Sequence, residues 1–170
     1  MNWKNNKKGF TLVEMLVYIS IFILVSGAAI GLLFSLNDLF VQYKLKQNLL
    51  STGTTVMERL LIEVREADSV IVADSTLSST TAGVLVLDKG TNTVKIIKNG
   101  NQLDIYEDNI FSSHLNDSDV EVTGATFYHY IKDGKELVRF RLDLRSVSGS
   151  QSEDWTITSG AIIRGSYANI

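Results

Sequence analysis

The chain of 170 residues has no cysteine, no proline and only two histidines. Without cysteine no disulfide can brace the fold, and nothing can be inferred about the redox compartment. His114 and His129 lie on different predicted elements, so they do not form a metal set. Glycine patterns that cradle phosphates and the Gly-x-Ser-x-Gly motif of hydrolases are also missing. These absences argue against an enzyme, and we expect no cofactor and no metal.

A long apolar run near the N-terminus is the most informative feature that is present. Lys7, Lys8 and Gly9 stand directly before it, and Glu14 is the only charged residue within it. From Met15 to Leu36 there is no charge over 22 residues. As a helix this segment would be about 33 Å long. A bilayer core is about 30 Å thick, so the segment can span a membrane.

The residues from Lys7 to Glu14, KKGFTLVE, resemble the type IV prepilin signal. That signal has a short basic leader ending in Gly, then Phe or Met, Thr-Leu-Ile/Val-Glu and an apolar helix. The resemblance implies that a prepilin peptidase removes the leader, residues 1–9, by cleaving between Gly9 and Phe10. It also implies N-methylation of the new Phe10 amino group. An ordinary signal peptide or signal anchor is the alternative, but the run is too long for a secretory signal and lacks its small-residue cleavage site.

The resemblance also implies a role for Glu14 in filament assembly. After cleavage, the Phe10 amine and the Glu14 carboxylate would lie in or near lipid, where each charge alone is costly. Pairing the two, within one subunit or between neighbours, offsets much of that cost. The alternative is that Glu14 reaches the headgroups as an isolated interfacial acid.

Charge predicts the orientation in the membrane. Lys4, Lys7 and Lys8 precede the span, so the N-terminus should remain in the cytoplasm and everything after Leu36 should lie outside the cytoplasmic (inner) membrane. That outer portion keeps 13 of the 16 basic residues and 18 of the 19 acidic residues, so its formal charge is −5. A mildly acidic domain has no general electrostatic affinity for nucleic acid.

A small basic patch is still compatible with this acidic balance. Arg139, Arg141 and Arg145 alternate along one predicted strand and are the best candidates for it. Alternating arginines on a strand are more often a solvated face than a ligand site. Asn116 to Glu121 resembles a calcium loop in composition alone, since the spacing and the central glycine of an EF-hand are absent. A solvated loop is the simpler interpretation of that segment.

The helical pattern continues after Leu36 in amphipathic form, which predicts one helix from Phe10 to about Val70. Gly53-Thr54-Thr55 is a weak helical segment and a candidate bend. Gly27 and Gly31 can weaken the membrane helix or form a small-residue face against a neighbouring helix. The apolar stripe of the second half consists of Leu45, Leu49, Gly53, Val56, Leu60, Val64, Ala67 and Ile71.

Alternating patterns predict strands in the rest of the chain. Loops are expected at 74–83, at 108–119 as an irregular segment, and at 146–153 as a flexible one. Asn99-Gly100 and Asp133-Gly134 predict hairpin turns. The expected strands are Gly83–Leu87, Thr93–Lys98, Gln102–Glu107, Thr123–Ile131, Glu136–Leu144 and Trp155–Ile163.

We therefore expect an α+β, pilin-like fold: a leader (1–9), a membrane or filament-core helix (10–36), its amphipathic continuation (37–73) and an antiparallel β domain (74–170) packed on that continuation.

The soluble part resembles J-type minor pseudopilins of type II secretion and related minor pilins. The resemblance implies a structural, minor subunit of a type IV pilus, a secretion pseudopilus or a DNA-uptake filament. Expected partners are other pilin-like subunits, the prepilin peptidase and an inner-membrane assembly platform, with nucleic acid only in a DNA-uptake filament. The final location would be a filament at the cell surface. A signal-anchored extracytoplasmic domain that binds a ligand and never polymerises is the alternative.

Overall fold

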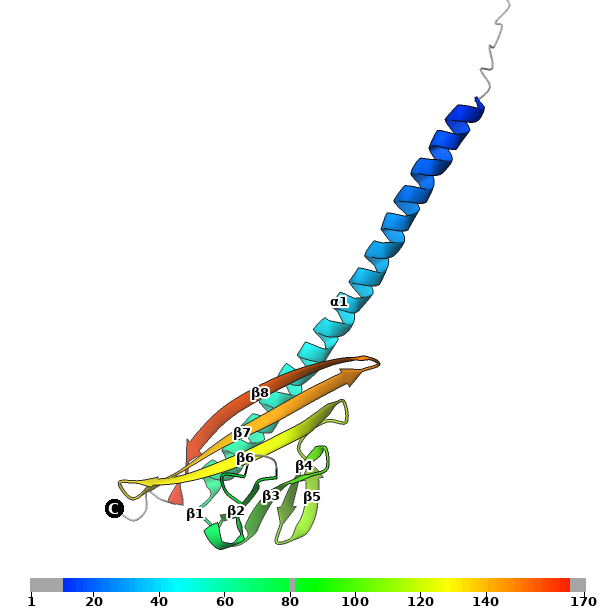
Figure 1. The fold of residues 1–170 in the computed structure, drawn as a ribbon. Coiled ribbons are helices and arrows are strands. Elements are labelled where there is room, and N and C mark those ends of the chain that lie inside the picture. Colours follow the sequence, from blue (N-terminus) through cyan, green and yellow to red (C-terminus); the bar gives the residue numbers. More distant parts are fainter. Residues whose placement is uncertain (1–10, 80–81, 166–170) are drawn as a thin grey trace, which may run out of the picture. The chain divides into compact units, whose positions relative to one another are not determined.

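The computed structural model describes residues 11–79 and 82–165. In this part of the chain one long helix, α1, precedes a short 3-10 helix, η1, and eight antiparallel strands that form two sheets (Figure 1). The chain divides into two compact units, residues 1–40 and 41–170. The α+β class, with one long N-terminal helix and antiparallel sheets, is confirmed.

Helix α1 spans Leu12–Glu66, which is 55 residues. The prediction that it continues to about Val70 is wrong, because the chain forms a strand, β1 (Ser69–Val70), soon after Glu66. The backbone N–H of Asp68 donates to the carbonyl of Asp88 at 2.7 Å, so pairing with the sheet replaces the next helical turn. η1 (Val72–Asp74) follows directly.

The half of α1 that belongs to the second unit buries the predicted apolar stripe. Its helix continues without interruption through Gly53, which is buried. Within the stripe Ile71 is the exception, since it lies after the helix and is only partly buried. The buried members are Leu45, Leu49, Gly53, Val56, Leu60, Val64 and Ala67.

The first sheet is a five-stranded meander in the order β1-β2-β3-β4-β5. The predicted hairpin between β3 and β4 is present, but its turn lies one residue later than Asn99-Gly100. Asn99 ends β3 and pairs with Gln102, so Gly100, with φ of 58°, and Asn101 form the turn. The segment 108–119, predicted to be irregular, contains strand β5. Asp108 and Asn109 both have positive φ, 50° and 64°, as a tight type I′ turn requires, and this turn brings β5 back along β4. The strands after β1 are β2 (Val84–Asp88), β3 (Thr93–Asn99), β4 (Gln102–Glu107) and β5 (Ile110–His114).

The second sheet contains three long strands in the order β6-β7-β8: β6 (Val120–Lys132), β7 (Lys135–Ser148) and β8 (Gln151–Ile162). The Asp133-Gly134 turn is confirmed, with φ of 52° and 73°. The flexible loop predicted at 146–153 is wrong, since β7 and β8 extend into it and pair through Ser148 and Gln151. Gly149 follows β7 directly and supplies the positive φ, 61°, that so tight a turn needs.

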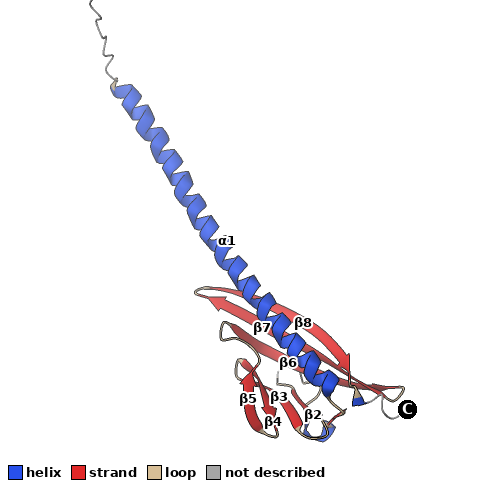
Figure 2. Ribbon diagram, turned by 180° about the vertical axis from the view of Figure 1, so that it is seen from behind, coloured by secondary structure: helices blue, strands red, loops and turns tan. Residues whose placement is uncertain are grey.

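The two sheets and the second-unit part of α1 enclose one hydrophobic core. Phe127 of β6 and Phe140 of β7 are fully buried in it, together with Leu60 of α1. In the view of Figure 2 the second-unit part of α1 lies in front of β6–β8, and Figure 1 shows the opposite face of that sheet. After β8 the chain returns to the end of α1, where the N–H groups of Arg164 and Gly165 donate to the carbonyls of Arg65 and Ala67. This contact satisfies carbonyls that the helix end leaves without partners.

Candidate functional site

The first turn of α1 is built by the threonine and the glutamate of the TLVE segment. Thr11 immediately precedes the helix, and its Oγ1 accepts a hydrogen bond from the backbone N–H of Glu14 at 3.3 Å. Its carbonyl accepts the N–H of Met15 at 3.2 Å. Thr11 is therefore the N-cap, and Glu14 occupies the third helical position, the spacing of a capping box. This role of Thr11 was not predicted from the sequence, although the Thr-x-x-Glu spacing signals it.

The carboxylate of Glu14 lies where a helix favours negative charge, because the first turn carries the positive end of the helix dipole. Glu14 is exposed, and no basic residue between positions 11 and 165, the loop at 80–81 aside, pairs with it. Its charge is thus available to a cation from outside the described part of the chain. The predicted processing residues Gly9 and Phe10, and the leader lysines Lys7 and Lys8, lie outside the described residues.

The first unit presents apolar side chains on all sides of its helix. All residues from Leu12 to Phe40 are exposed except Ser26, which is partly buried. α1 is long and apolar enough to cross a membrane. Nothing lies within 4 Å of a Cβ built at Gly27 or Gly31, so another helix can approach closely there. This surface requires lipid or other helices as its surroundings.

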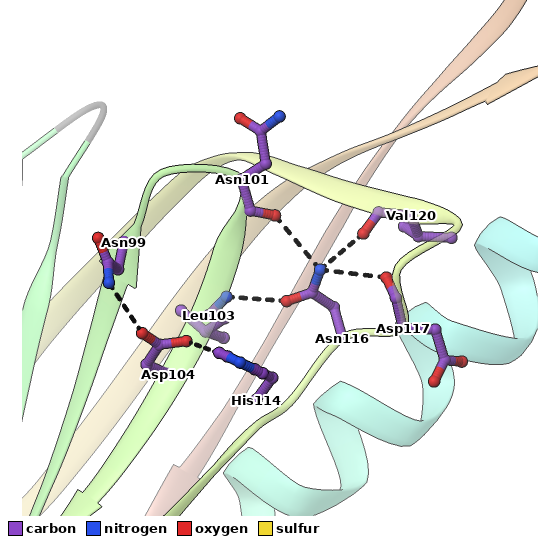
Figure 3. A network of polar contacts seen from close by, with 8 residues as sticks. All are labelled: Asn99, Asn101, Leu103, Asp104, His114, Asn116, Asp117 and Val120. Atoms are coloured by element: carbon purple, nitrogen blue, oxygen red, sulfur yellow. Dashed lines mark hydrogen bonds and ion pairs between the residues drawn. The ribbon is translucent and has the colours of Figure 1, made fainter. Parts of the chain in front are cut away.

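The possible calcium loop has a structural explanation in its own contacts (Figure 3). The side chain of Asn116 is buried, and its Oδ1 accepts the N–H of Leu103 at 2.8 Å. Its Nδ2 donates to the carbonyl of Val120 at 2.6 Å and also contacts the carbonyls of Asn101 and Asp117. Asn116 thereby holds the loop before β6 against the β3–β4 turn. The described residues contain no group of three His, Cys, Asp or Glu side chains that could hold a metal.

The two histidines each contact one carboxylate and lie on different sheets. His114 Nδ1 is 2.7 Å from Asp104 Oδ1, a carboxylate that is only 1% exposed (Figure 3). His129 Nε2 is 3.0 Å from Glu136 Oε2. Each pair links neighbouring strands, β4 with β5 and β6 with β7. The structure does not bring the histidines together.

The three arginines of the candidate basic patch differ in their partners. Arg145 forms two hydrogen bonds with Asp154, and these lower the pKa of the Asp154 carboxyl and raise the pKa of the Arg145 guanidinium. Arg141 donates to Asp143 at 3.1 Å. Arg139 has no carboxylate partner in the described ranges, 11–79 and 82–165. The charge of Arg139 is therefore the most available of the three.

Comparison with known families supports the interpretation of the N-terminus. The family described as the prokaryotic N-terminal methylation motif matches residues 4–30, which is the type IV prepilin signature. No curated protein and no solved structure matches the chain. The signature indicates a type IV pilin-like, membrane-anchored protein that prepilin peptidase processes and that assembles with other pilin subunits. Signature and fold together indicate a structural subunit rather than an enzyme.

Proposed function

We propose that the chain is a minor subunit of a type IV pilus-like filament. Prepilin peptidase cleaves between Gly9 and Phe10, and the Phe10 amine is then methylated. During assembly the Glu14 carboxylate pairs with the Phe10 amine of the same subunit or of a neighbouring one. The observation that carries this proposal is the first turn of α1, where Thr11 caps the helix and Glu14 presents a carboxylate without a described partner. An isolated acid beside an apolar span is costly, and a cationic amine would offset that cost.

The strand order of the second unit, residues 41–170, supports the assignment as a minor subunit. Two consecutive strand meanders, β1–β5 and β6–β8, follow one helix, as in the J-type minor pseudopilins that the sequence resembles. The filament would be a type IV pilus, a type II secretion pseudopilus or a DNA-uptake filament. Before assembly the subunit would reside in the inner membrane, with its N-terminus in the cytoplasm and its sheet domain outside the cytoplasmic membrane. An assembly platform would then extract it into the filament.

The mature N-terminus tests this function. Mass spectrometry of the native protein should find a chain that begins at Phe10 and is heavier by one methyl group. Gly9→Val should leave the leader attached, because the larger side chain obstructs the scissile bond, whereas Asn6→Val in the same leader should be cleaved normally. A native protein that retains Met1, or that begins within the apolar run, would contradict the proposal and favour the signal-anchored domain.

A further inference from the structure

No described helix or strand covers the face of the β6–β8 sheet that is turned away from α1, here called the outer face (Figure 1). Side chains alternate along a strand, and residues directly opposite on paired strands share a face. The inner side chains of β7 are buried, whereas Leu137, Arg139 and Arg141 between them are exposed. The outer face is therefore defined by these residues and by the ones that pair with them.

One end of the outer face combines aromatic and basic side chains. The register of β6 and β7 pairs Tyr128 with Arg139, Tyr130 with Leu137, and Lys132 with Lys135. We call the following six residues the aromatic–basic patch: Tyr128, Tyr130, Lys132, Lys135, Arg139 and Arg141. The acidic residues of the outer face, Glu121, Asp143 and Asp154, lie toward its other end, beside Arg141 and Arg145.

The two tyrosines form nearly parallel rings beside an available cation. Their ring centroids are 6.4 Å apart with an interplanar angle of 16°, and Tyr130 is 48% exposed. On the other side of Arg139 the register places Gly160 of β8. A Cβ at Gly160 would come within 2.9 Å of the Val138 carbonyl, so this position has no room for a side chain that would cover Arg139. Arg139 thus has Tyr128, which is stacked on Tyr130, on one side and the bare backbone of Gly160 on the other.

We propose that the aromatic–basic patch binds single-stranded nucleic acid. Exposed ring faces stack on bases without regard to sequence, and arginine and lysine side chains neutralise the phosphates between them. Two other ligands fit the patch less well. A double helix does not expose its base faces for stacking, and an acidic protein would pair with the cations but would leave the tyrosine rings unused. Binding of this kind goes beyond the structural role and does not depend on assembly, so each can fail without the other.

Binding can be measured by fluorescence anisotropy on the full chain in detergent. The probe is a fluorescein-labelled oligothymidine of about 20 nucleotides, longer than the roughly 4–16 nucleotides that one OB fold, a domain that binds single strands by the same kind of contact, covers. Tyr130→Leu should weaken binding roughly tenfold through lost stacking. Arg139→Gln should weaken it about fivefold and reduce the salt dependence by about one phosphate contact. Arg145→Gln, on the same strand and face but paired with Asp154, is the matched control and should change affinity less than about twofold.

Three results would overturn the proposal. The first is no binding at about 20 mM salt, where phosphate contacts are strongest. The second is equal affinity of Tyr130→Leu and the wild type, which would leave an unspecific attraction for anions. The third is equally strong competition by polyglutamate or by a duplex of the same length, which would indicate an acidic protein surface or a duplex as the ligand. Thermal unfolding of each variant should match that of the wild type, since the changed side chains are exposed.

Discussion

The indole ring of Trp155 in β8 occupies the space that a side chain at Gly53 of α1 would need. Leu144 of β7 closes the same space, 3.1 Å from where a Cβ would lie. Gly53 thus allows the sheet to approach the helix closely, and this contact explains a glycine whose helix propensity alone argues against it.

Gly53→Ala should destabilise the second unit, residues 41–170. Overpacking typically costs about 1–3 kcal/mol, and the gain in helix propensity returns about 1 kcal/mol, so the free energy of unfolding should fall by up to about 2 kcal/mol. Thr54→Ala, at the next and exposed position, is the control and should stay within about 0.5 kcal/mol of the wild type. Chemical unfolding followed by far-ultraviolet circular dichroism measures both. Gly53→Ala combined with Trp155→Leu should recover part of the loss; no recovery would contradict the assigned contact.

Lys89 should stabilise the attachment of α1 to the first sheet. Its Nζ lies 2.7 Å from Glu63, whose side chain is 3% exposed, and 3.1 Å from Glu66. Lys89→Met leaves the Glu63 carboxylate with Arg59 alone. Removing one partner of a buried pair costs about 3–5 kcal/mol, and the remaining arginine should limit the loss to about 2–4 kcal/mol. Lys95→Met, also on the first sheet but without an ion pair to any described carboxylate, should have a much smaller effect in the same denaturant titration.

The same lysine should make stability depend on alkaline pH. Burial by itself lowers the pKa of Lys89, but the hydrogen bonds and charges of Glu63 and Glu66 outweigh it and raise that pKa. A raised pKa in the folded state means that the stabilisation is complete below the ordinary lysine pKa of about 10.4 and is lost as pH rises through the folded value. Unfolding free energies of wild type and Lys89→Met should therefore begin to converge above about pH 10.5. A constant difference across that range would contradict the ion pair.

Asn116 should contribute more to stability than its position in a polar loop suggests. Asn116→Ala leaves the N–H of Leu103 and the carbonyl of Val120 without their side-chain partners (Figure 3). Each unsatisfied buried group costs about 1–3 kcal/mol, so the two groups together should lower the free energy of unfolding by about 2–6 kcal/mol. Ser118→Ala, exposed in the same loop, should be nearly neutral. Hydrogen exchange at the Leu103 amide should accelerate in the first variant alone, and unchanged exchange there would contradict the assigned bond.

Glu14→Ala should impair assembly without impairing insertion or cleavage. Insertion should be slightly favoured, because the variant removes an acid from an apolar segment. In the filament the Phe10 amine would lack its partner, at a cost of about 3–5 kcal/mol. Recovery in sheared filaments, or with co-purified subunits, should fall at equal membrane levels, while Glu58→Ala on the soluble half of α1 should assemble normally. Equal recovery of Glu14→Ala and the wild type would contradict the proposed pairing.

The sequence predicted the helical stripe, six of the strands and two hairpins, because each depends on local periodicity or turn chemistry. It did not predict β5, since this short edge strand has no alternation of apolar and polar residues and is exposed along its whole length. It also extended α1 too far, because Val64, Ala67 and Ile71 keep a helical spacing while the N–H of Ile71 pairs with the carbonyl of Val86. Where α1 ends therefore depends on pairing with a later strand, β2, which the local sequence pattern does not indicate.

The candidate site likewise has some features that the local sequence predicts and others that only the fold reveals. The Thr11–Glu14 spacing is local, so the capping role could have been inferred from the sequence alone. The roles of Gly53 and Asn116 depend on partners far along the chain, Trp155 and Leu103, and needed the fold. The arginines were visible as a row, but only the structure separates Arg139 from its paired neighbours.

The continuity of α1 has a mechanical consequence. The helix that carries the apolar anchor is the same helix whose later turns bury Leu49, Val56 and Leu60 in the core, and no break in the helix separates the two parts. Tension applied to the anchor therefore reaches these core contacts through the helix itself and not through a loop. A subunit built in this way resists pulling through its packing, without a disulfide to hold it.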